Sequence, residues 1–283
     1  MEKAGQDVLL KLFCIDPSRL LRDKLAQGKA TVFFSATLTP LDYYHEMLGG
    51  NEGDGRLQVG SPFPRNHLRV LVADNISTRY KRREATYEQV VDRINAVVGE
   101  KTGNYLVYFP SYRYMEEVFN RFALKRPDLR LICQSSAMAE QEREDFLNQF
   151  SADNVETLVG FAVLGGIFGE GIDLVGERLS GVVIVGVGLP QLCVERDIIR
   201  DYFAERKGVG FEYAYVYPGM NKVLQAAGRV IRTENDRGVV ILIDERYAGG
   251  VYRQLLPVWW KPLLTARGSL DIGRALKSFW GNS

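Results

Sequence analysis

The residues whose types and spacing best suit chemistry are Gln225, Gly228, Arg229 and Arg232, within the sequence QAAGRVIR. If this stretch is an α-helix, spacings of four and seven residues bring Gln225, Arg229 and Arg232 onto one face. Two planar guanidinium groups one turn apart suit a polyphosphate better than a single carboxylate. Gly228 would lie inside that helix, where glycine costs about 1 kcal/mol relative to alanine, which indicates close approach by a ligand or backbone. Spacing alone leaves open a surface helix with two solvated arginines.

A second group of candidates follows two apolar runs. Ser111 and Tyr112 come directly after the run at 105–109, and Gln134 and Ser135 follow the run at 129–133. A helix that opens at Ser111 presents backbone N–H groups to a phosphate of a nucleic-acid strand, with Tyr112 near a base-stacking surface. An ordinary helix cap with core tyrosines fits these residues equally well. Gln134 and Ser135 could donate to a nucleic-acid backbone.

The third group lies in two short stretches rich in small residues. Gly169, Glu170, Gly171 and Asp173 form part of a glycine-dense stretch after an apolar run, and glycines let backbone N–H groups approach an anion. A purely structural turn is not excluded by this spacing. The stretch Ser35, Ala36 and Thr37 follows a β-branched and aromatic run, and in isolation it predicts the cap of a following helix.

Taken in order, these stretches resemble motifs of the DinG/XPD-like superfamily 2 DNA helicases. The SATL sequence at 35–38 resembles motif III, FPSYRYM at 109–115 motif IV, and EGID at 170–173 motif V. QAAGRVIR, followed by an acidic turn and by DERY at 244–247, resembles motif VI. The resemblance covers nearly the whole chain and implies the second RecA-like motor domain of an ATP-dependent DNA helicase.

The resemblance also implies roles for the candidate residues. Arg229 and Arg232 would reach the terminal phosphates of ATP as arginine fingers do, while Gln225 would sense the nucleotide or link neighbouring motifs. The remaining assignments are nucleotide binding for Gly171, Asp173 and Gly228; single-stranded DNA binding for Ser111, Tyr112, Gln134, Ser135, Gly169 and Glu170; and coupling between nucleotide state and DNA contact for Ser35, Ala36 and Thr37.

The phosphate-binding half of an ATP site is missing from the sequence. A P-loop needs GxxxxGK followed by Ser or Thr, but Asp23 stands where its first glycine would precede Gly28 and Lys29. No DEAH-like box follows a predicted strand. We therefore expect ATP and Mg²⁺ to be held by a first RecA-like motor domain that acts as partner, and we expect this chain alone not to hydrolyse ATP. The iron–sulphur module of the family lies in that first half, so no cluster is expected here.

The elements that must position these residues alternate regularly between strand and helix. Strands are predicted at 68–73, 104–109, 129–133, 157–163, 181–187 and 238–244, and helices at 84–99, 111–124 and 139–150. Such alternation predicts an α/β fold, a RecA-like three-layer αβα arrangement with a mostly parallel sheet. Further strands are predicted at 8–15 and from 30, with a helix at 17–26. We expect 1–60 to contact the first motor domain and 61–283 to form the second.

Composition excludes several classes of protein. The 36 basic and 35 acidic residues give a net charge of +1, so no global field holds nucleic acid, and any contact is a local groove. The densest basic cluster, at 79–83, is typical of a solvated loop. Cys14, Cys133 and Cys193 each have apolar neighbours, which predicts buried, reduced thiols and no metal site. The sequence has no signal peptide or apolar span, so we expect a cytoplasmic protein without membrane contact.

Two other functions remain open. The chain could be a non-catalytic nucleic-acid-binding module that keeps the same fold. The GxG at Gly186 and Gly188 after an apolar run could indicate a dinucleotide-binding oxidoreductase, but Gln191 replaces the expected third glycine and Pro190 stands where the phosphate-binding helix should start.

Overall fold

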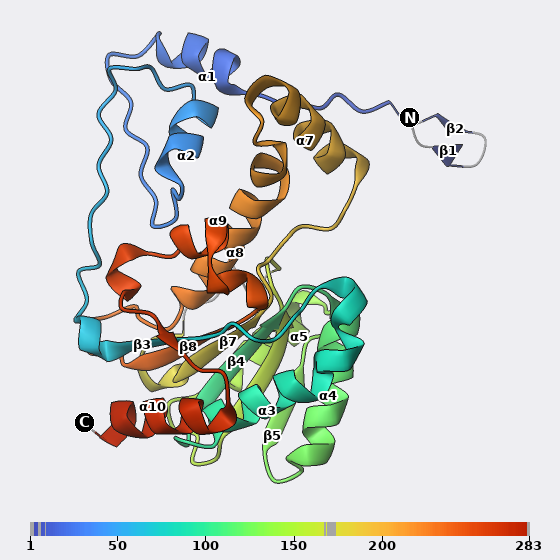
Figure 1. The fold of residues 1–283 in the computed structure, drawn as a ribbon, viewed down its shortest axis with the longest axis vertical. Coiled ribbons are helices and arrows are strands. Elements are labelled where there is room, and N and C mark those ends of the chain that lie inside the picture. Colours follow the sequence, from blue (N-terminus) through green and yellow to red (C-terminus); the bar gives the residue numbers. More distant parts are fainter. Residues whose placement is uncertain (1–2, 5–6, 9, 167, 169–173, 282–283) are drawn as a thin grey trace. The chain divides into compact units, whose positions relative to one another are not determined.

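The computed structural model describes residues 3–4, 7–8, 10–166, 168 and 174–281, and it divides into two compact units (Figure 1). We call Met1–Gln58 with Gln191–Tyr217 the helical unit, and Val59–Pro190 with Pro218–Ser283 the sheet unit. The chain thus passes between the units after residues 58, 190 and 217, and the expected division into 1–60 and 61–283 stays a prediction. Which segment contacts a first motor domain stays a prediction.

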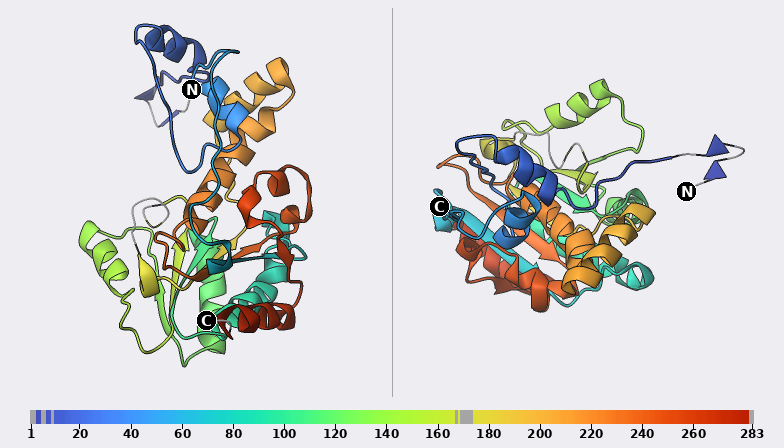
Figure 2. Two further views of the ribbon diagram at one scale, coloured as in Figure 1. Left: turned by 90° about the vertical axis from the view of Figure 1, so that its left-hand side faces the viewer. Right: turned by 90° about the horizontal axis from the view of Figure 1, so that it is seen from above.

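The sheet unit is built on seven strands in the order β5-β6-β4-β7-β8-β3-β9, and every neighbouring pair is parallel (Figures 1 and 2). The strands are β3 (Leu68–Ala73), β4 (Asn104–Phe109), β5 (Arg130–Cys133), β6 (Leu158–Val163), β7 (Gly181–Val185), β8 (Gly238–Ile243) and β9 (Leu264–Thr265). A parallel sheet is buried on both faces, which explains why these strands read as nearly continuous apolar runs. The predicted RecA-like α/β fold is confirmed.

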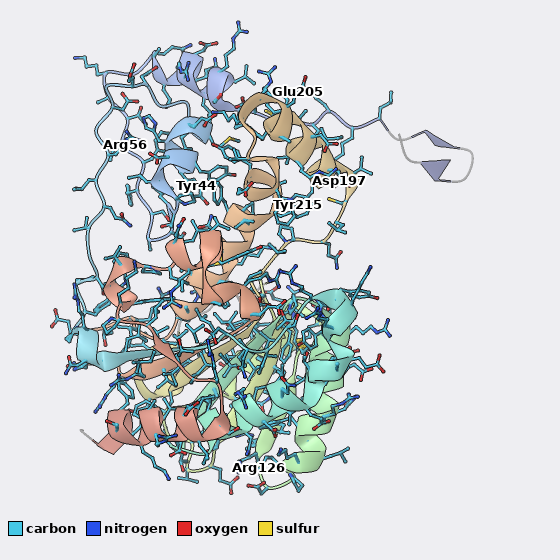
Figure 3. All side chains as sticks on the ribbon, viewed as in Figure 1. Tyr44, Arg56, Arg126, Asp197, Glu205 and Tyr215 are labelled. Atoms are coloured by element: carbon cyan, nitrogen blue, oxygen red, sulfur yellow. The ribbon has the colours of Figure 1, made fainter. Side chains whose placement is uncertain are left out.

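The helical unit contains α1 (Ser18–Leu25), α2 (Leu41–Met47), α7 (Val194–Lys207) and a π-helical turn, η5 (Glu212–Val216). Tyr213 of η5 packs edge-on against Tyr43 of α2, and its hydroxyl donates to Glu46 at 2.9 Å. Figure 3 labels Tyr215 and Asp197, whose hydroxyl and carboxylate lie 3.0 Å apart. Aromatic packing and these half-buried hydrogen bonds therefore hold the unit together. The unit also contains two short antiparallel strands, β1 (Lys3–Ala4) and β2 (Asp7–Val8).

The strands predicted at 8–15 and from residue 30 are wrong for the described residues 10–15 and 30–34, which form no strand. Leu12, Val32 and Phe34 are exposed instead. An isolated β-branched or aromatic run gains nothing from an extended conformation unless a second strand supplies hydrogen bonds and a packing surface. The described part of the helical unit offers these runs no such neighbour.

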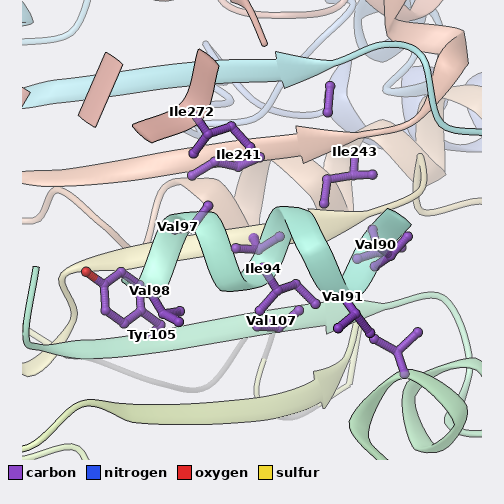
Figure 4. Close-up of a cluster of buried hydrophobic side chains, with 14 of the residues drawn as sticks. Val90, Val91, Ile94, Val97, Val98, Tyr105, Val107, Ile241, Ile243 and Ile272 are labelled. Atoms are coloured by element: carbon purple, nitrogen blue, oxygen red, sulfur yellow. The ribbon is translucent and has the colours of Figure 1, made fainter. Parts of the chain in front are cut away.

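One face of the sheet is covered by α3 (Tyr87–Val98), α4 (Tyr112–Lys125) and α10 (Ser269–Gly281). Val90, Ile94 and Val97 of α3 point into this core beside Ile241 and Ile243 of β8 (Figure 4). Each fully buried aliphatic side chain contributes about 1.5–3 kcal/mol. This layer fixes the strand ends that carry the candidate residues.

The other face is covered by α5 (Glu140–Asn148), while α8 (Tyr217–Ala227) begins beside Gly188, after the carboxyl end of β7, and leads to Val230, which packs against Gly238 at the amino end of β8. A Cβ on Gly160 of β6 would lie 2.6 Å from the ring of Phe150, so only glycine lets the segment after α5 pack this closely. The remaining short elements are α9 (Gly250–Gln254) and the helical turns η1 (Arg65–His67), η2 (Tyr80–Arg82), η3 (Glu84–Thr86), η4 (Gly176–Arg178), η6 (Glu245–Ala248) and η7 (Val258–Trp260).

The cysteines are not all buried as expected. Cys14 and Cys193 are exposed in the helical unit, because the apolar runs around them have no described partner, and only Cys133 at the end of β5 is half-buried. Burial raises the pKa of the Cys133 thiol to about 11. Within the described ranges, no helix is long and apolar enough to cross a membrane, and no three acidic, His or Cys side chains gather as metal ligands.

Candidate functional site

The carboxyl ends of the parallel strands meet at one edge of the sheet, where ligands bind in folds of this kind. Because β5, β6 and β4 are neighbours, Gln134, Gly165 and Ser111 come to this edge together. The predicted residues Gly169, Glu170, Gly171 and Asp173 lie outside the described residues. Their roles stay predictions.

Ser111 is the N-cap of α4. Its backbone is extended, with φ −162° and ψ 154°, and its hydroxyl accepts the N–H of Tyr114 at 3.4 Å. The hydroxyl is therefore engaged in capping, while the positive end of the α4 dipole faces the ligand edge of the sheet. The ring of Tyr112 packs against the main core cluster and leaves its hydroxyl at the sheet edge.

Gln134 joins three elements with one side chain. It is 8% exposed; its Oε1 accepts the N–H of Val163 at 2.8 Å, and its Nε2 donates to the hydroxyl of Tyr112 at 2.9 Å. The amide thus ties the end of β5 to the end of β6 and to the first turn of α4. Its neighbour Ser135 is exposed at the same edge. Contact with DNA by either residue stays a prediction.

The glycine-dense loop after β6 lies against a lysine of α8. Gly165 has φ +76°, and a Cβ there would lie 2.5–2.9 Å from the side-chain Cδ, Cε and Nζ atoms of Lys222. The left-handed backbone is what favours glycine at 165, and the end of the flexible Lys222 side chain lies beside it. Lys222, which the sequence analysis did not single out, therefore lies beside the carboxyl end of β6.

The helix expected through Arg232 ends earlier, and this corrects the shared-face argument. α8 stops at Ala227, and the N–H groups of Arg229 and Val230 bond back three residues, to Ala226 and Ala227 at 3.3 Å each. Arg232 lies in the following loop, so Gln225, Arg229 and Arg232 do not share a helix face. Gly228 is likewise at the end of the helix rather than inside it.

The loop after α8 is shaped by Asp236. One carboxylate oxygen accepts the N–H of Arg232 at 2.6 Å and that of Thr233 at 2.8 Å. The other accepts the Thr233 hydroxyl at 2.7 Å and the N–H of Gly176 at 3.1 Å. Burial acts to raise the pKa of Asp236, but these hydrogen bonds outweigh it and hold the pKa below its ordinary value. Asp236 therefore fixes the backbone that carries Arg232.

Arg229 lies on the inner side of this loop. It is half-buried, and its positive charge opposes the rise in the pKa of Tyr108 that burial causes. Tyr108 belongs to β4, and its hydroxyl donates to the carbonyl of Phe168 at 2.5 Å. The Arg229 side chain is therefore close to Tyr108, whereas Arg232 is exposed.

The GxG stretch after β7 packs against α8. Gly186 and Gly188 have φ values of +95° and +68°, and a Cβ on Gly188 would lie 2.4 Å from the carbonyl oxygen of Gly219. In residues 186–193, all of which are described, no helix begins. The glycines thus allow backbone packing, and the helix that a bound dinucleotide needs after this turn is not formed.

Ser35, Ala36 and Thr37 belong to the helical unit. The N–H of Thr37 donates to the Ser35 hydroxyl at 3.2 Å, a local turn that precedes α2. Their coupling role stays a prediction.

Two residues escaped the sequence analysis: Lys222, beside the carboxyl end of β6, and Asp236, which precedes the amino end of β8. Lys222 is one turn before Gln225 on α8, so extending the helix by one turn towards its N-terminus would have found it. For Asp236 the signal was the TENDRG turn before an apolar run, because Asp and Asn side chains commonly bond to nearby backbone N–H groups in turns.

The chain is similar to a known protein family and to curated helicases. Residues 94–263, more than half of the chain, match a family described as the helicase C-terminal domain. Among curated proteins, the chain is 24% identical to ATP-dependent DNA helicase CHL1 of Debaryomyces hansenii over 98% of its own length and 37% of that protein. It is 29% identical to the probable ATP-dependent helicase MJ0942 of Methanocaldococcus jannaschii, covering 80% of this chain and 36% of that protein.

Solved structures agree on the fold. A structure titled XPD_Helicase superposes with a TM-score of 0.63 at 25% identity, covering 82% of this chain and 41% of that one. A structure titled XPD_APO gives 0.62 at 22% identity, covering 82% and 47%. The chain thus spans a little over a third of the length of the curated relatives named above.

Proposed function

Because the chain belongs to the helicase C-terminal domain family, we propose that it is the second RecA-like motor domain of an ATP-dependent DNA helicase. In this proposal it supplies arginines to the terminal phosphates of ATP and forms part of a single-stranded DNA track. ATP and Mg²⁺ are held mainly by a first motor domain. The similar proteins named as ATP-dependent helicases support this assignment.

The observation that carries the proposal is the fixed arginine loop. Arg229 and Arg232 lie between α8 and the amino end of β8, in a segment whose backbone is fixed by the hydrogen bonds that Asp236 accepts. Guanidinium groups placed on a rigid backbone stabilise charge that develops on a transferring phosphoryl group without reorganising at that moment. Correctly oriented donors, rather than a shared helix face, are what this chemistry requires.

The DNA track is proposed along the ends of β4 and β5. The positive end of α4 at Ser111 and the exposed Ser135 offer backbone and hydroxyl donors to phosphates. Gln134 and Tyr112 hold these two strand ends together through the 2.9 Å amide–hydroxyl hydrogen bond. A strand bound here would run along the carboxyl ends of β4 and β5.

The proposed partner domain would also complete the helical unit. Residues 10–13 and 32–34 carry exposed Leu, Val and Phe side chains in extended, apolar runs. Such runs suit pairing or packing with strands of another domain. The neighbouring stretch at 35–37 would then reach the cleft between the two motor domains, where coupling takes place.

The test is ATP hydrolysis by the chain alone and by a two-domain protein in which a nucleotide-binding first motor domain precedes it. We expect no DNA-stimulated hydrolysis by the chain alone and hydrolysis by the two-domain protein that Arg232→Ala abolishes. DNA-stimulated hydrolysis by the isolated chain, lost in Arg232→Ala, would contradict the assigned division of labour.

A further inference from the structure

The segment that follows β3 crosses the carboxyl edge of the sheet instead of returning directly to α3 (Figure 1). The Ser77 hydroxyl donates to Glu245 at 2.9 Å, and Thr78 donates to the buried carboxylate of Asp244, both at the end of β8. Farther along, the guanidinium of Arg83 lies 4.7 Å from the ring centroid of Tyr114, in the first turn of α4. The segment 77–86 therefore bridges the β8 end and the start of α4.

These contacts hold the inner side of the segment firmly. The Thr86 hydroxyl donates to the carbonyl of Ser77 at 2.9 Å, which closes the loop, and Arg83 Nε donates to the carbonyl of Thr78 at 3.0 Å. Arg79 forms an ion pair with Glu245 at 2.7 Å. The turn between these anchors, Tyr80–Arg82, is held in one helical conformation.

The outer side of the turn presents the aromatic ring of Tyr80 beside the positive charges of Lys81 and Arg82. Tyr80 is 74% exposed, and the guanidinium carbon of Arg83 lies 5.5 Å from the centroid of its ring. Lys81 and Arg82 are both exposed, and among the described residues neither has an ion-pair partner. A core tyrosine or a chain of surface ion pairs would not leave the ring and two cations facing solvent together.

We propose that Tyr80, Lys81 and Arg82 form a further contact for single-stranded nucleic acid, with one base stacked on Tyr80 and the two cations beside the adjacent phosphates. Proteins that hold single strands combine aromatic stacking surfaces with cationic tracks in this way. This contact rests on the proposed function and extends it.

The turn continues the proposed track rather than forming a separate surface. Tyr80 contacts Arg83, Arg83 contacts Tyr114, and the N–H of Tyr114 bonds to the Ser111 hydroxyl at the start of α4. A single nucleic-acid strand with one phosphate at the N-terminus of α4 would therefore reach the exposed ring of Tyr80 when it continues towards the segment 77–86. The structure thus changes the interpretation of the 79–83 cluster from a solvated loop to a binding element.

The test is fluorescence anisotropy with a labelled oligothymidylate of about 12 nucleotides, within the length that single-strand-binding folds cover. Tyr80→Ala should weaken binding on the order of tenfold, because stacking contributes about 1–3 kcal/mol per base. Tyr80→Trp should keep the affinity. Replacing Lys81 and Arg82 together with alanine should lower the slope of log affinity against log salt by about 1.4.

The matched control removes two exposed positive charges from α10, by Arg274→Ala with Lys277→Ala. This control should bind as the unchanged chain does, and all variants should unfold at the same temperature because the substituted side chains are exposed. If the unchanged chain binds the oligonucleotide but Tyr80→Ala does not weaken binding, the inference is wrong while the proposed function stands. If the double alanine variant weakens binding of dextran sulphate as much as binding of the oligonucleotide, the turn is a general polyanion site and the inference is again wrong. No binding by the unchanged chain would overturn both this inference and the DNA track.

Discussion

The backbone N–H of Arg232 donates to the carboxylate of Asp236 at 2.6 Å. This bond crosses a four-residue turn and joins an exposed arginine to a carboxyl group that is 4% exposed. The same carboxylate also holds Gly176, at the far side of the glycine-dense loop. The arginine loop and the segment after the glycine-dense loop are therefore fixed by one side chain.

We expect Asp236→Asn to destabilise the chain by about 1–3 kcal/mol, since hydrogen bonds to a charged, buried group are lost or weakened. The asparagine amide would also present N–H donors to the N–H groups of Arg232 and Thr233. Urea unfolding followed by circular dichroism measures the change. Glu234→Gln, at an exposed position in the same turn, is the control and should leave the midpoint unchanged. An equal effect of both substitutions would show that the carboxylate does not organise the loop.

The same carboxylate predicts an acid-sensitive stability. The hydrogen bonds hold the folded-state pKa of Asp236 below its ordinary value of 3.8, so its contribution is fully present above that value. It is lost as the pH falls through the lower folded-state pKa. Unfolding midpoints measured from pH 6 down to about pH 3 should therefore drop more steeply for the unchanged chain than for Asp236→Asn. Parallel curves would contradict this account.

The two arginines should differ when substituted in the two-domain helicase. Arg232→Ala should lower kcat for ATP hydrolysis by about a thousandfold or more, with little change in stability because the side chain is exposed. Arg229→Ala should lower kcat and also the melting temperature, because Arg229 is half-buried near Tyr108. Steady-state kinetics and thermal melts separate the two effects. Arg274→Ala serves as the control for loss of a surface arginine, and an unchanged kcat in Arg232→Ala would remove the arginine from the mechanism.

Gln134 should matter more than its exposed neighbour. Gln134→Leu leaves the buried N–H of Val163 without its acceptor, so we expect a loss of about 1–3 kcal/mol in the free energy of unfolding. Ser135→Ala should leave stability unchanged because Ser135 is exposed. Chemical denaturation of both variants checks this pair. A stable Gln134→Leu protein would mean that the amide does not join the strand ends.

The sheet could be predicted from the sequence because its strands are buried on both faces. Runs such as 104–109 and 238–243 are apolar at nearly every position, and this signal is local. The N-cap at Ser111 was also visible, since a small hydroxyl residue at the end of a strand and before a helical pattern is typical of a cap.

The residue at which α8 ends could not be predicted from the sequence. The apolar periodicity continued through Val230 and Ile231, but the helix stops before them. Asp236 accepts the N–H of Arg232. Val230 packs against Gly238, where a Cβ would lie 2.3 Å from the Val230 side chain. Both causes lie beyond the helical pattern itself. The apolar runs at 10–15 and 30–34 failed for a related reason, since strand formation depends on a neighbour that periodicity does not reveal.

The close approach of Gly188 and Gly219 has a consequence for how such chains can vary. The chain leaves the sheet unit after Pro190 and re-enters it at Pro218, so this glycine pair closes the base of the whole excursion Gln191–Tyr217. A loop whose two ends already meet can be lengthened at an entropic cost that grows only with the logarithm of its length. Residues can therefore be added within Gln191–Tyr217 at low entropic cost while the close contact of Gly188 with Gly219 is kept.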